Sequence, residues 1–270
     1  MDATPLTVKH PIGVFDSGVG GLSILKALRA ELPHEDFVYV ADSGYAPYGE
    51  RDDAHVIDRS RTLTAYLRTR HDIKALVIAC NTATAAAIHL LRQEHPDLPI
   101  VGVEPALKPA VAHSKTRHIG VMATRGTLGS AKFRTLLQSL SSQATFACQP
   151  CDGLADAIER EDTTKIIALC ADYTGATGQF GTKNNQIDTL VLGCTHYPFA
   201  REHLIRLVGP GVCLIDNGEP VARQTRRMLL AHASDLQAGR CQLISTGHPG
   251  SLQRAAQHWL DLACAVQSLG

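Results

Sequence analysis

Short apolar runs alternate with longer mixed stretches along the whole chain. The runs are three to five residues long and rich in β-branched residues. Most are apolar at nearly every position, a pattern typical of strands buried on both faces of a parallel sheet. We therefore expect strands at residues 12–15, 37–41, 75–79, 100–103, 119–122, 189–193, 213–215 and 242–245.

The stretches between these runs carry helical patterns. Residues 22–32 place apolar side chains three and four positions apart, which predicts a helix. A second helix is expected from Thr82 to about His95, ending before Pro96 because proline cannot continue a helix. Alternation of strand and helix over the whole chain predicts an α/β fold with parallel sheets flanked by helices.

Two parts of the sequence echo each other. Residues 12–16 are IGVFD and residues 119–123 are IGVMA, while ALVIACNTA (75–83) is matched by TLVLGCTHY (189–197). In the second pair an apolar strand ends in Ala or Gly and is followed at once by a cysteine. The echo indicates a duplicated α/β unit with Cys80 and Cys194 in equivalent positions. Chance similarity between buried strands is the alternative.

Cys80 and Cys194 each follow the carboxyl end of a predicted strand, where open α/β sheets bind ligands. A helix is expected to begin at each, and its N-terminus would favour a thiolate. Cysteine is more often simply buried in a core. That interpretation suits the four cysteines within apolar stretches, but not two that polar residues follow directly. The four are Cys170, Cys213, Cys241 and Cys264.

Composition narrows the class of protein. The 270 residues include 26 basic and 26 acidic side chains, so no net charge attracts nucleic acid or an anionic membrane. No apolar run approaches the roughly 18 residues that span a bilayer, and the N-terminus does not resemble a signal peptide. We expect a cytoplasmic protein whose eight cysteines are reduced thiols.

Three other kinds of site compete for these residues. Cys148 and Cys151 have C-x-x-C spacing, but no second pair or close histidine pair completes a zinc site. Thiol redox chemistry at the same pair is a second alternative, but the pair lacks the early βαβ placement of such motifs. The loop Gly18–Gly21 follows the first strand and Asp42 ends the second, as in a dinucleotide site. The third glycine of that motif would fall at Ser23, however.

Two thiols facing each other across a cleft suit a different reaction. Inverting an amino acid at Cα requires one group to remove the proton and another to deliver a proton to the opposite face. A cysteine from each half of a duplicated fold would supply both groups. Asp16 and His196 are expected nearby, where they would set the protonation of the thiols or hold the substrate's ammonium and carboxylate groups. A helix N-cap and an ordinary loop histidine are the alternatives for these two residues.

Five motifs together resemble the glutamate racemases of the cofactor-independent Asp/Glu racemase family. The resemblance runs from about Pro11 to the C-terminus and implies interconversion of L- and D-glutamate without cofactor or metal. It also implies a role in supplying D-glutamate for peptidoglycan, and so in cell-wall synthesis and cell shape. The motifs are DSGVGG (16–21), ADSGYAPYGE (41–50), ACNTATA (79–85), GVEPALKPA (102–110) and LGCTHYPF (192–199).

The resemblance also implies roles for individual residues. Cys80 would act on the D enantiomer and Cys194 on the L enantiomer, with Asp16 and His196 assisting. An auxiliary glutamate is matched best by Glu159, in the stretch 151–162. The implied substrate contacts are Asp16, Ser17, Tyr48, Gly49, Asn81, Thr82, Thr124, Thr195 and His196.

The family's architecture has two pseudo-symmetric α/β lobes with the active site between them. Weak seams near Leu98–Pro99 and Gly209–Gly211 predict a first lobe of residues 1–98 plus 210–270 and a second of residues 99–209. Glutamate is the expected partner, with neither nucleic acid nor membrane, and a homodimer is one expectation.

Two functional alternatives stay open: a racemase of aspartate or another amino acid, and a catalytically silent amino-acid-binding protein. Some enterobacterial members of the family carry an N-terminal extension and need the activator UDP-N-acetylmuramoyl-alanine. Only about eleven residues precede Ile12 here. We therefore expect activity without that activator.

Overall fold

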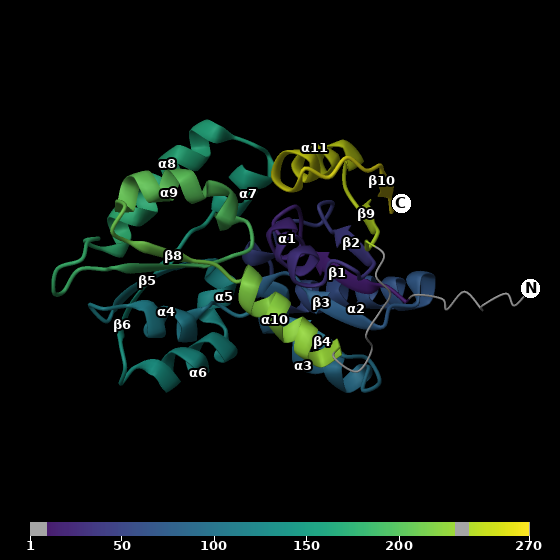
Figure 1. The fold of residues 1–270 in the computed structure, drawn as a ribbon, viewed down its shortest axis with the longest axis horizontal. Helices are drawn as coiled ribbons and strands as arrows, with labels where there is room; N and C mark the ends of the chain where they lie inside the picture. Colours follow the sequence, from purple (N-terminus) through teal and green to yellow (C-terminus); the bar gives the residue numbers. More distant parts are fainter. Residues whose placement is uncertain (1–9, 230–237, 270) are drawn as a thin grey trace, which may run out of the picture.

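The computed structural model describes residues 10–229 and 238–269 and contains two parallel sheets, one in each of two lobes (Figure 1). The first sheet has the order β10-β9-β2-β1-β3-β4, and the second has the order β6-β5-β7-β8. The strands of the first are β1 (Ile12–Asp16), β2 (Phe37–Ala41), β3 (Ala75–Ile78), β4 (Ile100–Gly102), β9 (Cys241–Ser245) and β10 (Val266–Ser268). Those of the second are β5 (His118–Ala123), β6 (Thr145–Pro150), β7 (Thr189–Gly193) and β8 (Cys213–Ile215).

The two sheets share an order of four strands, as expected for a duplicated unit. The segment β2-β1-β3-β4 of the first sheet matches β6-β5-β7-β8 of the second strand for strand. The echoing sequences occupy equivalent positions, with β1 equivalent to β5 and β3 to β7. Cys80 follows β3 and Cys194 follows β7, so the two cysteines are equivalent by topology as well as by sequence.

Helices cover the faces of both sheets. Those of the first lobe are α1 (Leu22–Glu31), α2 (Asp53–His71), α3 (Asn81–Glu94), α10 (Gly218–Leu229) and α11 (Pro249–Leu260), with the short η1 (Tyr48–Glu50). Those of the second are α4 (Leu107–His113), α5 (Arg125–Gly129), α6 (Ala131–Leu140), α7 (Leu154–Glu159), α8 (Thr163–Thr177) and α9 (Arg201–Val208), with η2 (Tyr197–Ala200). Within the described ranges, none of these helices is long and apolar enough to cross a membrane.

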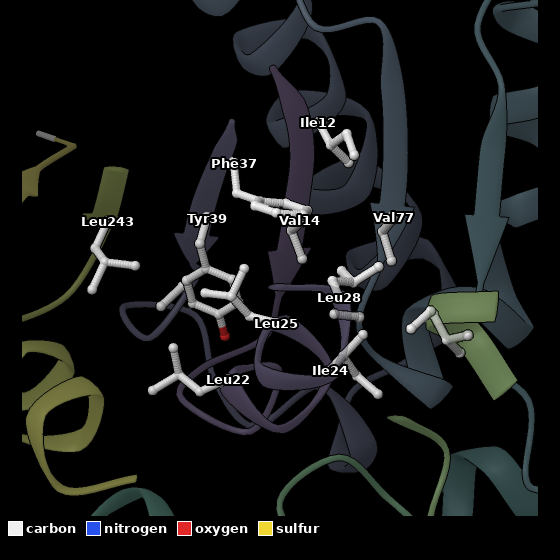
Figure 2. Packing of buried hydrophobic residues seen from close by; sticks show 14 of the residues in the cluster. Ile12, Val14, Leu22, Ile24, Leu25, Leu28, Phe37, Tyr39, Val77 and Leu243 are labelled. Carbon is white, nitrogen blue, oxygen red and sulfur yellow. The ribbon is translucent and has the colours of Figure 1, made fainter. Parts of the chain in front are cut away.

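The core explains why the strands are apolar on both faces. On one face of the first sheet, side chains such as Val14 and Tyr39 pack against Leu25 and Leu28 of α1 (Figure 2). On the other face, strand residues such as Ile78 pack with α2 and α3. Burial on both faces removes the alternation of apolar and polar residues that a half-exposed strand would show.

The eight predicted strands are confirmed, each boundary lying within one residue of the prediction. The helix predicted from Thr82 to about His95 is α3, and the one at residues 22–32 is α1. The sequence analysis missed β6 and β10. Both lie at sheet edges and are partly exposed, so neither shows the continuous apolar run of a central strand.

The changes of sheet along the chain come later than the predicted seams. The strand after Leu98–Pro99 is β4, which pairs with β3 of the first sheet. The strand after Gly209–Gly211 is β8, which pairs with β7 of the second. The C-terminal segment then adds β9 and β10 to the first sheet. Strand pairing thus favours lobe boundaries near residues 103 and 216, and the division into domains stays a proposal.

Four cysteines were expected to be buried in apolar surroundings. Cys170 is fully buried in the core of the second lobe, as predicted. Cys213 is exposed on edge strand β8, so the prediction is wrong there, and Cys241 and Cys264 are partly buried. A strand that forms the edge of its sheet has no neighbour to cover its outer side.

Candidate active site

The carboxyl ends of the strands in the two lobes meet at one cleft, which encloses about 610 Å³ of empty space including its open mouth. The first lobe contributes the segments after β1, β2 and β3, and the second contributes those after β5, β6 and β7. Every predicted site residue except Asp16 lines this cleft. The lining includes Ser17, Tyr48, Gly49, Cys80, Asn81, Thr82, Thr124, Glu159, Cys194, Thr195 and His196.

Cys80 lies at the start of α3, on the wall of the cleft that the first lobe forms. Its sulfur accepts a hydrogen bond from the backbone N–H of Ala83 (3.4 Å), so Cys80 is the N-cap of the helix. Its S–H is placed to donate to Ser17 Oγ, 3.9 Å away. Burial raises the pKa of the Cys80 thiol well above its ordinary value, and the nearby negative charge of Asp16 raises it further. The expectation that the helix N-terminus would favour a thiolate is wrong here, because burial outweighs the N–H of Ala83, and Cys80 is held as a thiol.

Cys194 lies on the opposite wall, directly after β7. The prediction that a helix begins at both cysteines is right for Cys80 and wrong here: a turn and η2 follow Cys194, and α9 begins only at Arg201. The partner of Cys194 is a side chain instead of a helix terminus. His196 Nδ1 lies 3.8 Å from the sulfur, and both residues are buried.

His196 also contacts Glu159, which comes from α7. Its Nε2 lies 3.0 Å from Glu159 Oε2, forming an ion pair when the ring is protonated. Burial alone would lower the pKa of His196, but hydrogen bonds with Cys194 and Glu159 outweigh it and hold that pKa well above its usual value. Burial likewise opposes ionisation of Glu159, yet its hydrogen bonds leave its pKa lowered. The two side chains form a charged pair beside Cys194.

Asp16 lies beneath the loop after β1 and is fully buried. Its Oδ2 accepts hydrogen bonds from the backbone N–H groups of Gly21 (2.7 Å) and Gly18 (3.4 Å). Among the described residues its Oδ1 has no hydrogen-bond partner. Burial raises the pKa of Asp16 to about 6. The N-cap of α1 is Gly21, so Asp16 holds the loop and affects Cys80 by its charge, and does not cap the helix.

The glycine-rich loop weighed as a dinucleotide motif has another use. A Cβ on Gly18 would lie 2.2 Å from Glu159 Oε2, and a Cβ on Gly20 would lie 2.2 Å from His196 Nδ1. Any side chain at either position would displace these groups, because real Cβ contacts are never that short. Because the loop has no side chain at these two positions, Glu159 and His196 of the second lobe can lie directly against the first lobe.

Hydroxyl groups from the two lobes meet on a further part of the cleft. Thr82 Oγ1, on α3, lies 3.0 Å from Thr124 Oγ1, at the end of β5. Thr124 also accepts the backbone N–H of Thr127 and so caps α5. Gly49 lies so close to Thr124 that an added Cβ would come within 2.9 Å of it. The predicted contacts Gly49, Thr82 and Thr124 are therefore brought together.

The sequence analysis missed two residues that support the cleft from behind. Asp42 accepts hydrogen bonds from Tyr48 Oη and from Arg59 Nε (2.9 Å), which fixes the tyrosine. Ser43 donates its hydroxyl to Glu159 Oε1 at 2.7 Å. A signal for both was present, because Asp42-Ser43-Gly44 repeats the Asp16-Ser17-Gly18 motif at the end of the neighbouring strand.

The C-x-x-C pair is split between two environments. Cys151 is buried and lines the cleft, while Cys148 is exposed on edge strand β6. In the part of the chain that the structure describes, no group of three or more His, Cys, Asp or Glu side chains is placed to hold a metal ion.

Comparisons with known proteins agree with this geometry. The family model described as Asp/Glu/Hydantoin racemase matches residues 22–225. The chain is 48% identical over 225 residues to the glutamate racemase of Methylococcus capsulatus, covering 83% of this chain and 80% of that protein.

Two solved structures have the same fold. The glutamate racemase of Bacillus anthracis superposes with a TM-score of 0.84 at 32% identity, covering 97% of this chain and 98% of that one. The glutamate racemase of Escherichia coli, in complex with L-glutamate and the activator UDP-MurNAc-Ala, gives 0.80 at 27% identity, covering 97% and 100%.

Proposed function

The chain belongs to the Asp/Glu/Hydantoin racemase family, and from this premise we propose that it interconverts L- and D-glutamate by two-base proton transfer at Cα. The observation that carries the proposal is the pair Cys80 and Cys194. They follow equivalent strands of a duplicated fold, and each lobe presents one of them to the same cleft.

The two thiols need no cofactor for this reaction. When L-glutamate is bound, a thiolate at Cys194 removes the Cα proton from one face and the thiol of Cys80 delivers a proton to the other. The raised pKa of Cys80 supports its role as the donor in this direction. With D-glutamate the roles reverse, and Cys80 takes the proton while Cys194 supplies one.

Each thiol has its own neighbouring ionisable groups. The His196–Glu159 pair lies beside Cys194, and the imidazole Nδ1 is within reach to exchange or share a proton with the sulfur. Asp16 lies on the side of Cys80 and influences it by charge. We propose that Asp16, His196 and Glu159 set the protonation states of the two thiols and do not themselves transfer a proton to or from Cα.

The remaining residues of the cleft suit an amino-acid substrate. Hydroxyl groups of Ser17, Thr82, Thr124 and Thr195 and the amide of Asn81 offer donors and acceptors for an ammonium group and two carboxylates. Tyr48, held by Asp42, and Gly49 shape the wall opposite Thr124. Asp16 is withdrawn from this set, because it is buried beneath the cleft surface.

The biological setting is part of the same proposal. D-glutamate made by this reaction would enter peptidoglycan synthesis, and so cell-wall assembly and cell shape. A cytoplasmic location, where Cys80 and Cys194 would stay reduced, belongs to the same proposal. A homodimer is also proposed, and α8 and α9, which pack against each other, expose the apolar side chains Ile167, Ile205 and Leu207. The expectation of activity without an activator was drawn from the residues ahead of Ile12, of which residues 1–9 lie outside the described part of the chain.

The test is a racemisation assay on the purified chain without added pyridoxal phosphate. We expect L-glutamate to convert to an equal mixture of enantiomers, because these have equal free energies in water, and L-aspartate to react at least about tenfold more slowly in kcat/KM. Faster turnover of aspartate would favour the alternative racemase. Glutamate binding in a calorimeter without any turnover would favour the silent binding protein.

A further inference from the structure

Glu159 belongs to the second lobe, but most of its hydrogen bonds are to the first. Its Oε1 accepts the hydroxyl of Ser43, which follows β2, at 2.7 Å. Its Oε2 accepts the backbone N–H of Val19, in the loop after β1, at 2.8 Å. The same Oε2 lies 3.0 Å from His196 Nε2. Only 15% of the Glu159 side chain is exposed.

We propose that Ser43 is a positioning residue that acts through Glu159 and His196 on Cys194. The inference rests on the proposed function, and it adds a residue that does not itself line the cleft. Ser43 would fix the carboxylate against the first lobe, so that the carboxylate can hold the imidazole beside the thiol. Because Ser43 and Glu159 come from different lobes, this arrangement is complete only when the lobes lie together.

Hydrogen-bond accounting supports this role. A carboxylate that leaves water needs donors on both oxygens, since losing a partner for a buried charged group costs more than losing a neutral hydrogen bond. Val19 and His196 both approach Oε2, and the Ser43 hydroxyl supplies Oε1. Without the hydroxyl, the ionised form of Glu159 loses stability, and its hold on a protonated His196 weakens.

Within the described residues, the Ser43 hydroxyl donates to Glu159 and not to the other titratable groups around this pair. Cys194 faces the imidazole, Asp16 on β1 acts on both His196 and Glu159 by charge, and Tyr39 on β2 feels the charge of Glu159. The only other acidic residue of α7 that lines the cleft, Asp156, forms ion pairs with Arg160 and Lys165. A change in the pKa of His196 on mutation of Ser43 is thus attributable to Glu159.

The experiment compares wild type with Ser43→Ala, Ser43→Thr and, as a matched control, Ser141→Ala. Ser141 is exposed at the C-terminal end of α6, where its hydroxyl donates to the backbone oxygen of Gln138. The first readout is NMR titration of the histidine signals, with His196 identified as the signal absent from His196→Gln. We expect its pKa to fall by about one unit in Ser43→Ala, because its charged partner is weakened.

The second readout is the pH profile of kcat/KM in both directions. The basic limb, where His196 loses its proton, should move about one unit lower in Ser43→Ala, so that kcat/KM at pH values above the limb falls roughly tenfold. The reduction must be equal for the two enantiomers, since their equilibrium constant is one. Ser43→Thr keeps the hydroxyl and should remain within about threefold of wild type, as should Ser141→Ala.

The outcomes separate this proposal from the proposed function. A wild-type protein that does not racemise glutamate defeats the proposed function, while the NMR titration still tests the link from Ser43 to His196. An unchanged His196 pKa in folded Ser43→Ala overturns the positioning role, whatever happens to kcat. The same pKa shift in Ser43→Thr as in Ser43→Ala overturns it too, because the hydroxyl would then not be the cause.

Discussion

Replacing either Cys80 or Cys194 with alanine is expected to abolish racemisation in both directions, with a loss of at least about 10³-fold in kcat/KM. Each face of Cα has its own acid or base, so removing one thiol leaves one half of the proton transfer without a group to perform it. Serine at either position should be nearly as damaging, because a hydroxyl is a much weaker acid than a thiol. Initial rates from L- and from D-glutamate, followed by chiral chromatography, measure the effect.

A cysteine outside the cleft serves as a control, because its replacement removes a thiol without touching the site. Cys213 is exposed on an edge strand of the second lobe, and Cys213→Ala should leave the rate unchanged. Alkylation of the wild type should inactivate it, and glutamate should slow that inactivation. Turnover above about 10% in either Cys80→Ala or Cys194→Ala would show that another residue serves that face.

The second large effect is expected from Gly20→Ala, which adds one methyl group and removes no catalytic or substrate-binding side chain. The added Cβ would meet the imidazole of His196 at 2.2 Å, so the ring must move away from Cys194 or the lobes must separate. Displacements of about 1 Å at a reacting group can cost about 10²-fold in rate, and we expect a fall of that size in kcat/KM. Steady-state kinetics in both directions measure it.

Gly20→Ala should fold normally, since Gly20 is not among the residues with a left-handed backbone conformation. Gly129→Ala is the matched control, because a Cβ there meets nothing within 4 Å. It should keep wild-type kinetics, and a cooperative thermal transition in both variants would show that the loss of rate in Gly20→Ala is not a loss of the fold. Full activity in Gly20→Ala would mean that the contact between His196 and the loop is not needed for turnover.

The central strands could be predicted because a strand that is buried on both faces needs apolar residues at nearly every position. Strands β6 and β10 could not, since their side chains are mostly partly or fully exposed and so need no such run. Sheet membership after the two seams was also beyond the sequence: proline and glycine near residues 98 and 210 mark breaks in local structure, but they do not say which sheet the next strand joins.

The candidate site divides in the same way. Cys80 and Cys194 stood out because polar residues follow them directly at strand ends, which local sequence shows. The contact of Glu159 with Ser43 and Val19 joins residues more than a hundred positions apart, and no local pattern reports it. The burial of Asp16 beneath its loop likewise depends on how Gly18 and Gly21 fold over the carboxylate.

The central claim is that one thiol takes the proton and the other supplies a different one. The most direct measurement is racemisation of L-glutamate in D2O, with both enantiomers analysed by mass spectrometry early in turnover. The thiol at Cys80 exchanges with solvent, so two-base transfer predicts D-glutamate that carries deuterium at Cα, while unreacted L-glutamate keeps protium. D-glutamate that retains the substrate's own hydrogen at Cα would contradict the claim, because a single base would then have carried that hydrogen from one face to the other.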